Sequence, residues 1–277
     1  MTRFMAGLGK KVLIANYAGS LAESLLKDVD NAAVLSVWIG VLFYAFQIYF
    51  DFSGYSDMAI GLGRMFGFDY PENFKHPYIA TSITDFWRRW HITLSSFFRD
   101  YVYIPLGGNK GGLAKQLRNI AIVWLLTGFW HGASWNFVLW GVYFGVLLVL
   151  EKLFLLRWLK RLPAVLRHIY ALVLVTISWT LFVFTEISKG AAWCKAMFSG
   201  VPFDNSSLYL LLTYGPMLAI CALAATPLGK RFYKKLGTRL GQRALTVVDC
   251  GGLACVLAMA AAYLVSGSYN PFLYFRF

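Results

Sequence analysis

Apolar stretches alternate with short charged stretches along the chain, a pattern typical of membrane-spanning helices. Residues 31–50 are uncharged and largely apolar, and a transmembrane helix needs about 20 such residues. Further uncharged stretches follow at residues 169–185, 205–229 and 250–275. Residues 12–22 are too few to span alone, so we interpret them as the end of a longer helix or as an interfacial helix. The pattern predicts an all-α, polytopic helix bundle.

The most informative stretch is an uncharged run at residues 119–150, with His131 near its centre. The run is long for one membrane span and short for two. Gly128 and Gly132 flank the histidine, and a glycine weakens a helix by about 1 kcal/mol relative to alanine. We therefore expect two short helices or one broken, re-entrant helix, with His131 buried at the break. An ionisable group at membrane depth is a functional candidate, although a hydrogen-bonded strut between helices explains this run equally well.

The charge distribution supports a membrane protein and excludes a nucleic-acid-binding one. Hydrophobic residues make up 58% of the chain and charged residues 14%, where a soluble domain carries about 25% charge. The net charge of +13 comes from basic residues between the apolar stretches. The positive-inside rule explains this better than nucleic-acid binding does, and it predicts that residues 152–167 and 230–243 are cytoplasmic and residues 186–204 external.

The ends of the central run carry the same sign of charge. Lys115 and Arg118 precede it, and Lys152 follows it. Both ends are therefore expected on the cytoplasmic side. This favours a hairpin that enters the membrane and returns, with His131 near its apex.

Two carboxylates interrupt the apolar segment at residues 49–68, namely Asp51 and Asp57. Carboxylates at membrane depth must face the bundle interior or a wet cavity. For Asp57 we favour a buried polar network that holds helices together, whereas Asp51 stays open as a substrate-binding candidate. The glycines of this segment indicate tight packing or a break.

Residues 70–106 contain no clean span, and Pro71 and Pro77 prevent a regular helix at the start. Thr84, followed by an aspartate, is a fair helix N-cap signal. Aromatic and basic side chains then crowd together, which is typical of an interfacial helix or a re-entrant segment. His91 lies among them, with Arg88 and Ser95 at helical spacing on either side.

The remaining chemistry-bearing residues point to no metal or redox site. The four cysteines, Cys194, Cys221, Cys250 and Cys255, form no C-x-x-C pair and no zinc-ligand spacing. Small packing residues are the simpler interpretation. We therefore expect neither a metal nor a bound cofactor.

Two long motifs resemble one known family. They read FQIYFDFSGYSDMAIGLGRMFGFDYPENFKHPYIATSITDFWRRWHITLSSFFRDYVYIPLGGN at residues 46–109 and LLTGFWHGASWNFVLWG at residues 125–141. Together with the closing NPFLYFRF, they resemble the membrane-bound O-acyltransferases, most of all the bacterial branch that acetylates alginate, peptidoglycan or cellulose. Family members carry further membrane helices before the point that matches residue 1. Residues 1–277 therefore resemble the C-terminal portion of that membrane domain.

The resemblance implies acyl transfer from a cytoplasmic-side donor, acetyl-CoA or a similar acyl donor, to a hydroxyl of an exported polysaccharide. It identifies His131 as the catalytic residue and His91 as the second one to consider. A neutral imidazole can take the proton of a hydroxyl that attacks a thioester, and the developing oxyanion needs hydrogen-bond donors, for which Trp130, Trp135, Asn136 or backbone near Gly132 are candidates.

The resemblance also implies partners and a location. Arg88 could bind donor phosphates or, equally well, lipid headgroups. A multi-pass protein of the cytoplasmic membrane is implied, working with a secreted SGNH-type (lipase-like) acetyltransferase. The alternatives are a D-alanyl transferase of the teichoic acid type, a transport subunit without chemistry, and a non-catalytic remnant.

Overall fold

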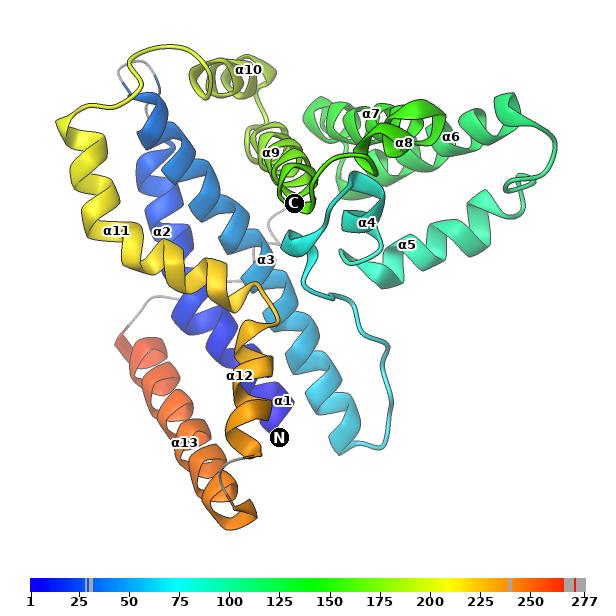
Figure 1. The fold of residues 1–277 in the computed structure, drawn as a ribbon. Helices are drawn as coiled ribbons and strands as arrows, with labels where there is room; N and C mark the ends of the chain where they lie inside the picture. The colour runs from blue at the N-terminus through cyan, green and yellow to red at the C-terminus, as the bar shows by residue number, and fades with distance from the viewer. Residues whose placement is uncertain (28, 30–31, 239–240, 267–271, 273–277) are drawn as a thin grey trace. The chain divides into compact units, whose positions relative to one another are not determined.

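The computed structural model describes residues 1–27, 29, 32–238, 241–266 and 272, and every regular element in these ranges is a helix (Figure 1). This confirms the all-α prediction. Five of the described helices are long and apolar enough to cross a membrane, as a multi-pass membrane protein requires: Val34–Met65, Trp135–Leu159, Ala164–Val183, Asn205–Ala224 and Arg243–Ser266.

The chain divides into two compact units. The first comprises Met1–Glu72 and Val201–Phe277, and the second comprises Asn73–Gly200. The first holds α1 (Thr2–Gly9), η1 (Lys10–Ala15), α2 (Asn16–Leu25), α3 (Val34–Met65), α11 (Asn205–Ala224), α12 (Leu228–Gly237) and α13 (Gln242–Ser266). The second holds η2 (Pro77–Ile79), α4 (Ile83–Trp87), α5 (Ile92–Phe98), η3 (Arg99–Tyr103), α6 (Leu113–His131), α7 (Trp135–Leu150), η4 (Glu151–Leu155), α8 (Leu156–Leu159), α9 (Ala164–Val183) and α10 (Ile187–Ala196).

In the first unit, α1, the π-helical η1 and α2 follow one another without a break and pack along α3. Residues 12–22 thus belong to a longer helical run, one of the two predicted possibilities. The helices approach closely because small residues lie at the crossing. A Cβ added at Gly7 would lie 2.5 Å from the carbonyl oxygen of Gly54, and one at Gly61 would lie 2.5 Å from the backbone nitrogen of Phe4.

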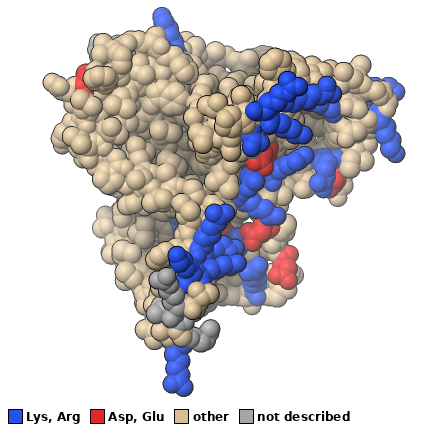
Figure 2. All heavy atoms as spheres, in the orientation of Figure 1, with Lys and Arg blue, Asp and Glu red and all other residues tan. Residues whose placement is uncertain are grey.

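Helix α3 is longer than predicted, since it runs unbroken through the glycines and carboxylates of residues 49–65. The glycines at positions 54 and 61 therefore serve packing and do not break the helix. The predicted stretch at residues 205–229 contains α11, which holds no Asp, Glu, Lys or Arg, and its surface is tan in Figure 2. The stretch at residues 250–275 belongs to α13 as far as Ser266, and residues 267–271 and 273–275 lie outside the described residues.

In the second unit, the central run folds as a helical hairpin of α6 and α7. Helix α6 ends at His131, and α7 begins at Trp135, which confirms the predicted break at the histidine. The two helices touch through glycines: a Cβ at Gly141 would lie 2.4 Å from the carbonyl oxygen of Trp124. The far ends also meet, because Lys152 Nζ donates to Asn109 Oδ1 at 3.2 Å.

The core of the second unit is aromatic. Trp87 of α4 lies in edge contact with Trp124 of α6 and with Trp140 and Phe144 of α7, at ring-centroid distances of 4.6, 5.6 and 4.9 Å. Trp140 also stacks on Trp179 of α9 at 6.3 Å. Burying rings of this size stabilises each contact by about 0.5–1.5 kcal/mol beyond the area that it removes from water. This core fixes α4, α6, α7 and α9 around the two histidines described next.

Candidate functional site

His131 is placed by the tight turn between α6 and α7. Gly132 follows it with a φ of +154°, and a Cβ there would lie 2.8 Å from the ring of Phe137. Only glycine fits this conformation and this space. The turn therefore ends α6 at the histidine and sends the chain back along α7.

The ring of His131 stands among aromatic rings. Its centroid is 4.9 Å from Trp140 and 5.3 Å from Phe182, both nearly perpendicular to it, and 4.9 Å from its neighbour Trp130. His131 itself is only partly buried. The histidine predicted to be buried at this position is thus less buried than expected, because its turn lies at the end of a two-helix hairpin. The buried histidine of this unit is His91, with 9% of its surface exposed.

His91 lies between α4 and α5 in a left-handed backbone conformation, with φ 45° and ψ 55°. A non-glycine residue in this region is strained by about 1–2 kcal/mol. The expected helical spacing of Arg88, His91 and Ser95 does not hold, because the helix breaks at His91. The predicted N-cap at Thr84 is also wrong: Ser82 is the N-cap of α4, and its hydroxyl accepts from the backbone N–H of Asp85 at 2.9 Å.

Asn73 holds the His91 ring. Asn73 Oδ1 lies 3.1 Å from His91 Nδ1, and the same oxygen accepts from the backbone N–H of Thr93 at 3.2 Å and from its hydroxyl at 2.9 Å. His91 lies outside the five candidate spans. Burial lowers the pKa of its imidazole from 6.5 to about 4, because charging the ring inside the protein costs solvation energy. His91 is thus neutral at physiological pH.

Trp130 brings the two histidines into one site. Its ring centroid is 5.8 Å from that of His91 and 4.9 Å from that of His131. The indole is half exposed, so one part of it contacts the imidazoles while the rest is open. Two imidazoles in contact with one partly open aromatic ring can bind an acceptor group and move a proton.

A buried carboxylate anchors the segment that leads to His91. Glu151 begins η4, at the end of α7, and is 1% exposed. Its oxygens accept from the backbone N–H groups of Ile83 and Thr84 at 2.7 and 2.8 Å, from the Thr84 hydroxyl at 2.6 Å and from the Tyr170 hydroxyl at 3.1 Å. A carboxylate at a helix N-terminus satisfies N–H groups that have no partner within the helix. Glu151 thus joins α7, which starts beside His131, to α4, which leads to His91.

A cavity of about 530 Å³ opens beside the site within the second unit. Its walls include Ile92, next to His91, and Thr127, one turn before His131. The lining of the cavity is mostly apolar. The polar side chains in it are Thr84, Arg88, Ser95, Ser96, Arg99, Tyr103 and Thr127. Arg88 is exposed there and forms no ion pair with any described residue, whereas its neighbour Arg89 is paired with Asp85 at 2.8 Å. The cavity therefore offers an apolar slot with a cation at its rim.

Asn136 and Asp51, two other predicted site residues, have different surroundings. The Asn136 amide donates to the carbonyl oxygens of Leu181 and Phe182 at 3.4 and 3.3 Å, which fastens α7 to the end of α9. Asp51 belongs to the first unit, where its buried carboxylate accepts from Lys11 Nζ at 2.5 Å.

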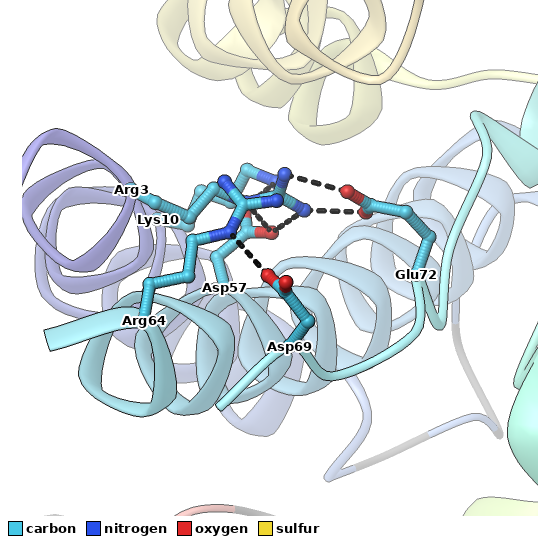
Figure 3. A network of polar contacts seen from close by, with 6 residues as sticks. All are labelled: Arg3, Lys10, Asp57, Arg64, Asp69 and Glu72. Atoms are coloured by element: carbon cyan, nitrogen blue, oxygen red, sulfur yellow. Dashed lines mark hydrogen bonds and ion pairs between the residues drawn. The ribbon is translucent and has the colours of Figure 1, made fainter. Parts of the chain in front are cut away.

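Asp57, also in the first unit, lies in an ion-pair network (Figure 3). It pairs with Arg3 at 2.6 Å and Lys10 at 2.7 Å, and Arg3 reaches on to Glu72 at 2.5 Å. In the same view, Arg64 approaches Asp69 at 3.8 Å. The network ties α1 and η1 to α3, in agreement with the packing role expected of Asp57.

The sequence did not point to Asn73, Glu151 or Phe182. Asn73 belongs to the PENF motif and lies 18 positions before His91, and Glu151 lies 67 positions after Thr84. The one local signal was a glutamate directly after a long uncharged run, since a charge that close to an apolar span needs a partner. Among the residues that the structure describes, no group of His, Cys, Asp and Glu side chains is arranged to hold a metal ion.

Comparison with known proteins places this chain in a family. Residues 3–189 match the sequence profile of MBOAT, the membrane-bound O-acyltransferase family. The chain is 36% identical to "Probable alginate O-acetylase AlgI" of Azotobacter vinelandii over all of this chain and 61% of that protein. It is 32% identical to the peptidoglycan O-acetyltransferase of Helicobacter pylori, over 99% of this chain and 55% of that protein.

A match of smaller extent is the teichoic acid D-alanyltransferase of Streptococcus thermophilus, 33% identical over 57% of this chain and 40% of that protein. The chain thus spans about three fifths of the length of the first two relatives. The family match covers both histidines, the hairpin between α6 and α7, and the cavity. On this evidence the chain belongs to the membrane-bound O-acyltransferase family.

Proposed function

We propose that this chain takes an acyl group, in the first instance acetyl, from a thioester donor such as acetyl-CoA and passes it to an acceptor hydroxyl, toward the hydroxyls of an exported or cell-wall polysaccharide. The observation that carries the proposal is that His131 and His91 both contact the ring of Trp130, close to a largely apolar cavity. The names of the relatives with full or nearly full coverage of this chain support acetyl transfer to a polysaccharide.

In the proposed reaction the acceptor oxygen attacks the thioester carbonyl carbon while the imidazole of His131 takes its proton. The carbon–sulfur bond then breaks, and the thiolate leaves with the proton that the imidazolium returns. The cavity holds the acyl thioester arm, and Arg88 at its rim attracts the donor's phosphate groups. Trp130, half exposed and in contact with both imidazoles, is positioned to contact the acceptor or to donate its indole N–H to the oxyanion.

The proposal includes a location and a partner. The protein works in the cytoplasmic membrane, with the donor reached from the cytoplasm and the acceptor outside. The acetyl group passes to the polysaccharide through a secreted SGNH-type acetyltransferase. The apolar candidate spans and the names of the relatives support a membrane setting.

The test uses a strain that lacks its own polysaccharide O-acetylation. The chain is expressed as 277 residues, and also as a chimera in which it replaces the matching segment of the Azotobacter vinelandii relative. Ester-linked acetate on exported glycans is measured. We expect acetate from the chimera, lost in His131→Ala at equal membrane level. Acetate that persists in His131→Ala would overturn the assignment of the base.

The same extracts distinguish acetyl transfer from the alternative function, D-alanyl transfer. The teichoic acid D-alanyltransferase covers a smaller share of this chain, which ranks D-alanyl transfer second. Ester-linked D-alanine in place of acetate, again lost in His131→Ala, would replace the acetyl assignment. A chimera without either ester, at normal membrane level, would refute acyl transfer by this chain.

A further inference from the structure

The environment of His91 determines which of its two ring nitrogens can act as a base. A neutral imidazole carries a proton on one nitrogen and a lone pair on the other, and hydrogen-bond partners decide which. Nδ1 of His91 has contacts with the side chains of Asn73 and Thr93.

The orientation of the Asn73 amide follows from a backbone donor. The N–H of Thr93 points at Asn73 at 3.2 Å, and a backbone N–H can only donate. The Asn73 atom that faces it must therefore be the carbonyl oxygen, since the NH₂ group has no acceptor capacity. This removes the usual ambiguity between oxygen and nitrogen in a side-chain amide.

The same oxygen then constrains His91. Asn73 Oδ1 lies 3.1 Å from His91 Nδ1, and a carbonyl oxygen can only accept. The Thr93 hydroxyl donates its one hydrogen to Asn73 Oδ1 at 2.9 Å, so toward Nδ1, at 3.4 Å, it offers a lone pair. Both of these groups face Nδ1 with an acceptor. Nδ1 must therefore carry the proton, and the lone pair lies on Nε2.

Asn73 also holds the strained backbone of His91. The backbone carbonyl oxygen of Asn73 accepts from the backbone N–H of Ile92 at 3.0 Å. Two residues further on, the backbone N–H of Lys75 donates to the backbone carbonyl oxygen of Arg89 at 2.9 Å. Two backbone hydrogen bonds thus bracket His91, whose φ is 45°. Strain of this kind persists only where the surroundings over-determine it, and it is found most often at functional sites. Asn73 is 9% exposed, so these contacts are shielded from water.

We propose that Asn73 is the positioning residue of His91: it fixes the Nδ1–H tautomer and the left-handed backbone, so that Nε2 is the nitrogen that accepts a hydrogen bond from the acceptor hydroxyl. His91 then orients that hydroxyl for attack while His131 removes its proton. The role of His91 toward the hydroxyl rests on the proposed function. The tautomer of His91 rests only on its contacts with Asn73 and Thr93.

The tautomer is tested by nitrogen NMR on the full chain in detergent micelles, labelled with ¹⁵N-histidine. The chain has four histidines, and His91→Gln assigns the signals of His91. We expect a protonated Nδ1 and an unprotonated Nε2 from pH 8 down to pH 5. A protonated Nε2 in the unaltered protein would overturn the proposal.

Substitutions test whether Asn73 is the cause. Asn73→Leu removes the acceptor, so we expect the Nε2–H form that a free imidazole favours in water. Asn119→Leu is the matched control, because Asn119 is another buried amide of the same unit and contacts the carbonyls of Leu106 and Gly108. It should leave the His91 signals unchanged. An Nδ1–H signal that survives in Asn73→Leu would contradict the role of Asn73.

If Asn73→Leu does not fold, Asn73→Asp decides the question. Its carboxylate keeps the acceptor and adds a negative charge, so the Nδ1–H signal should remain and the pKa of His91 should rise. No rise would contradict the contact.

The acyl-transfer assay tests the role of His91 toward the hydroxyl, independently of the NMR measurement of the tautomer. Asn73→Leu should lower kcat on the order of 100-fold, with a much smaller change in KM for the donor, since Nε2 of His91, once protonated, no longer accepts the hydrogen bond that orients the hydroxyl. Asn73→Asp should recover most of this loss above the raised pKa. If the unaltered chimera transfers no acyl group, the proposed function fails while the NMR result still decides the tautomer. If the chimera is active and Asn73→Leu retains full kcat, the role of His91 toward the hydroxyl is refuted.

Discussion

Glu151 Oε1 accepts a hydrogen bond from the backbone N–H of Ile83 at 2.7 Å, across 68 positions of sequence. The helix that carries Glu151 starts beside His131, and the helix that Ile83 begins leads to His91. One buried carboxylate therefore ties the end of α7 to the start of α4, and these helices adjoin the two segments that carry the imidazoles.

Removing this carboxylate should destabilise the protein. Glu151→Ala leaves two backbone N–H groups and two hydroxyls buried without their acceptor, and hydrogen bonds to a charged group contribute about 1.5–3 kcal/mol each. Because such losses do not add fully, we expect about 3–5 kcal/mol less stability, measured by denaturant unfolding in micelles. Thr84→Val loses one of these bonds and should cost about 1 kcal/mol. A Glu151→Ala protein as stable as the original would contradict the anchor role.

The turn after His131 depends on glycine for two separate reasons. Gly132→Ala introduces backbone strain and a Cβ at 2.8 Å from Phe137, so we expect a loss of about 2–4 kcal/mol together with a displaced His131 ring. Gly200→Ala is the control, because Gly200 also has a positive φ, of +113°, but no atom lies within 4 Å of its Cβ position. It should cost about 1 kcal/mol. Equal losses in the two variants would show that the contact with Phe137 is unimportant.

Close packing of α1 on α3 should be sensitive to one methyl group. In Gly61→Ala the new Cβ meets the backbone of Phe4 at 2.5 Å, and backbone cannot move aside as a side chain can. We expect about 2–3 kcal/mol of destabilisation by thermal unfolding. In Gly251→Ala, in α13, the Cβ meets nothing within 4 Å, so helix propensity should make that variant equally or slightly more stable. The idea fails if Gly61→Ala behaves like Gly251→Ala.

Stability should depend on pH through His91. Its pKa falls from 6.5 to about 4 in the folded protein, so between these values the unfolded chain binds one proton more than the folded chain. The stabilisation is therefore complete above pH 6.5 and is lost as pH falls toward 4, by about 3 kcal/mol in total. Unfolding curves at several pH values measure this slope, and His91→Gln should flatten it. The same slope in that variant would assign the effect to other groups.

Two adjacent arginines should differ in their effect on the donor. Arg88 lies at the cavity and has no ion-pair partner among the described residues, whereas Arg89 is paired with Asp85. Arg88→Gln should raise KM for a phosphate-bearing thioester about tenfold, and less at high salt. Arg89→Gln should alter stability more than KM. Unchanged KM in Arg88→Gln would assign that side chain to lipid headgroups.

The site was only partly predictable from the sequence. The two histidines, the break after His131 and the cation at Arg88 were identified from local features. The break was predictable because Gly132 allows a backbone conformation that other residues rarely adopt, and this conformation ends α6 at His131. The geometry that makes His91 useful was not predictable, because the helical spacing of Arg88 and Ser95 suggested a continuous helix. The contacts with Asn73 interrupt that helix, and no local pattern encodes them.

The sequence by itself determined that the chain is helical and suited to a membrane, since apolar length and the scarcity of charge are properties of the chain that do not depend on its folding. It also determined which family the motifs resemble. Only the tertiary structure decided that α3 runs through its glycines, that Asp57 pairs with Arg3, that Asn73 contacts His91, and that Glu151 ties α7 to α4. These choices depend on partners tens of residues away, and a buried polar group is satisfied by whichever partner the packing brings within about 3 Å.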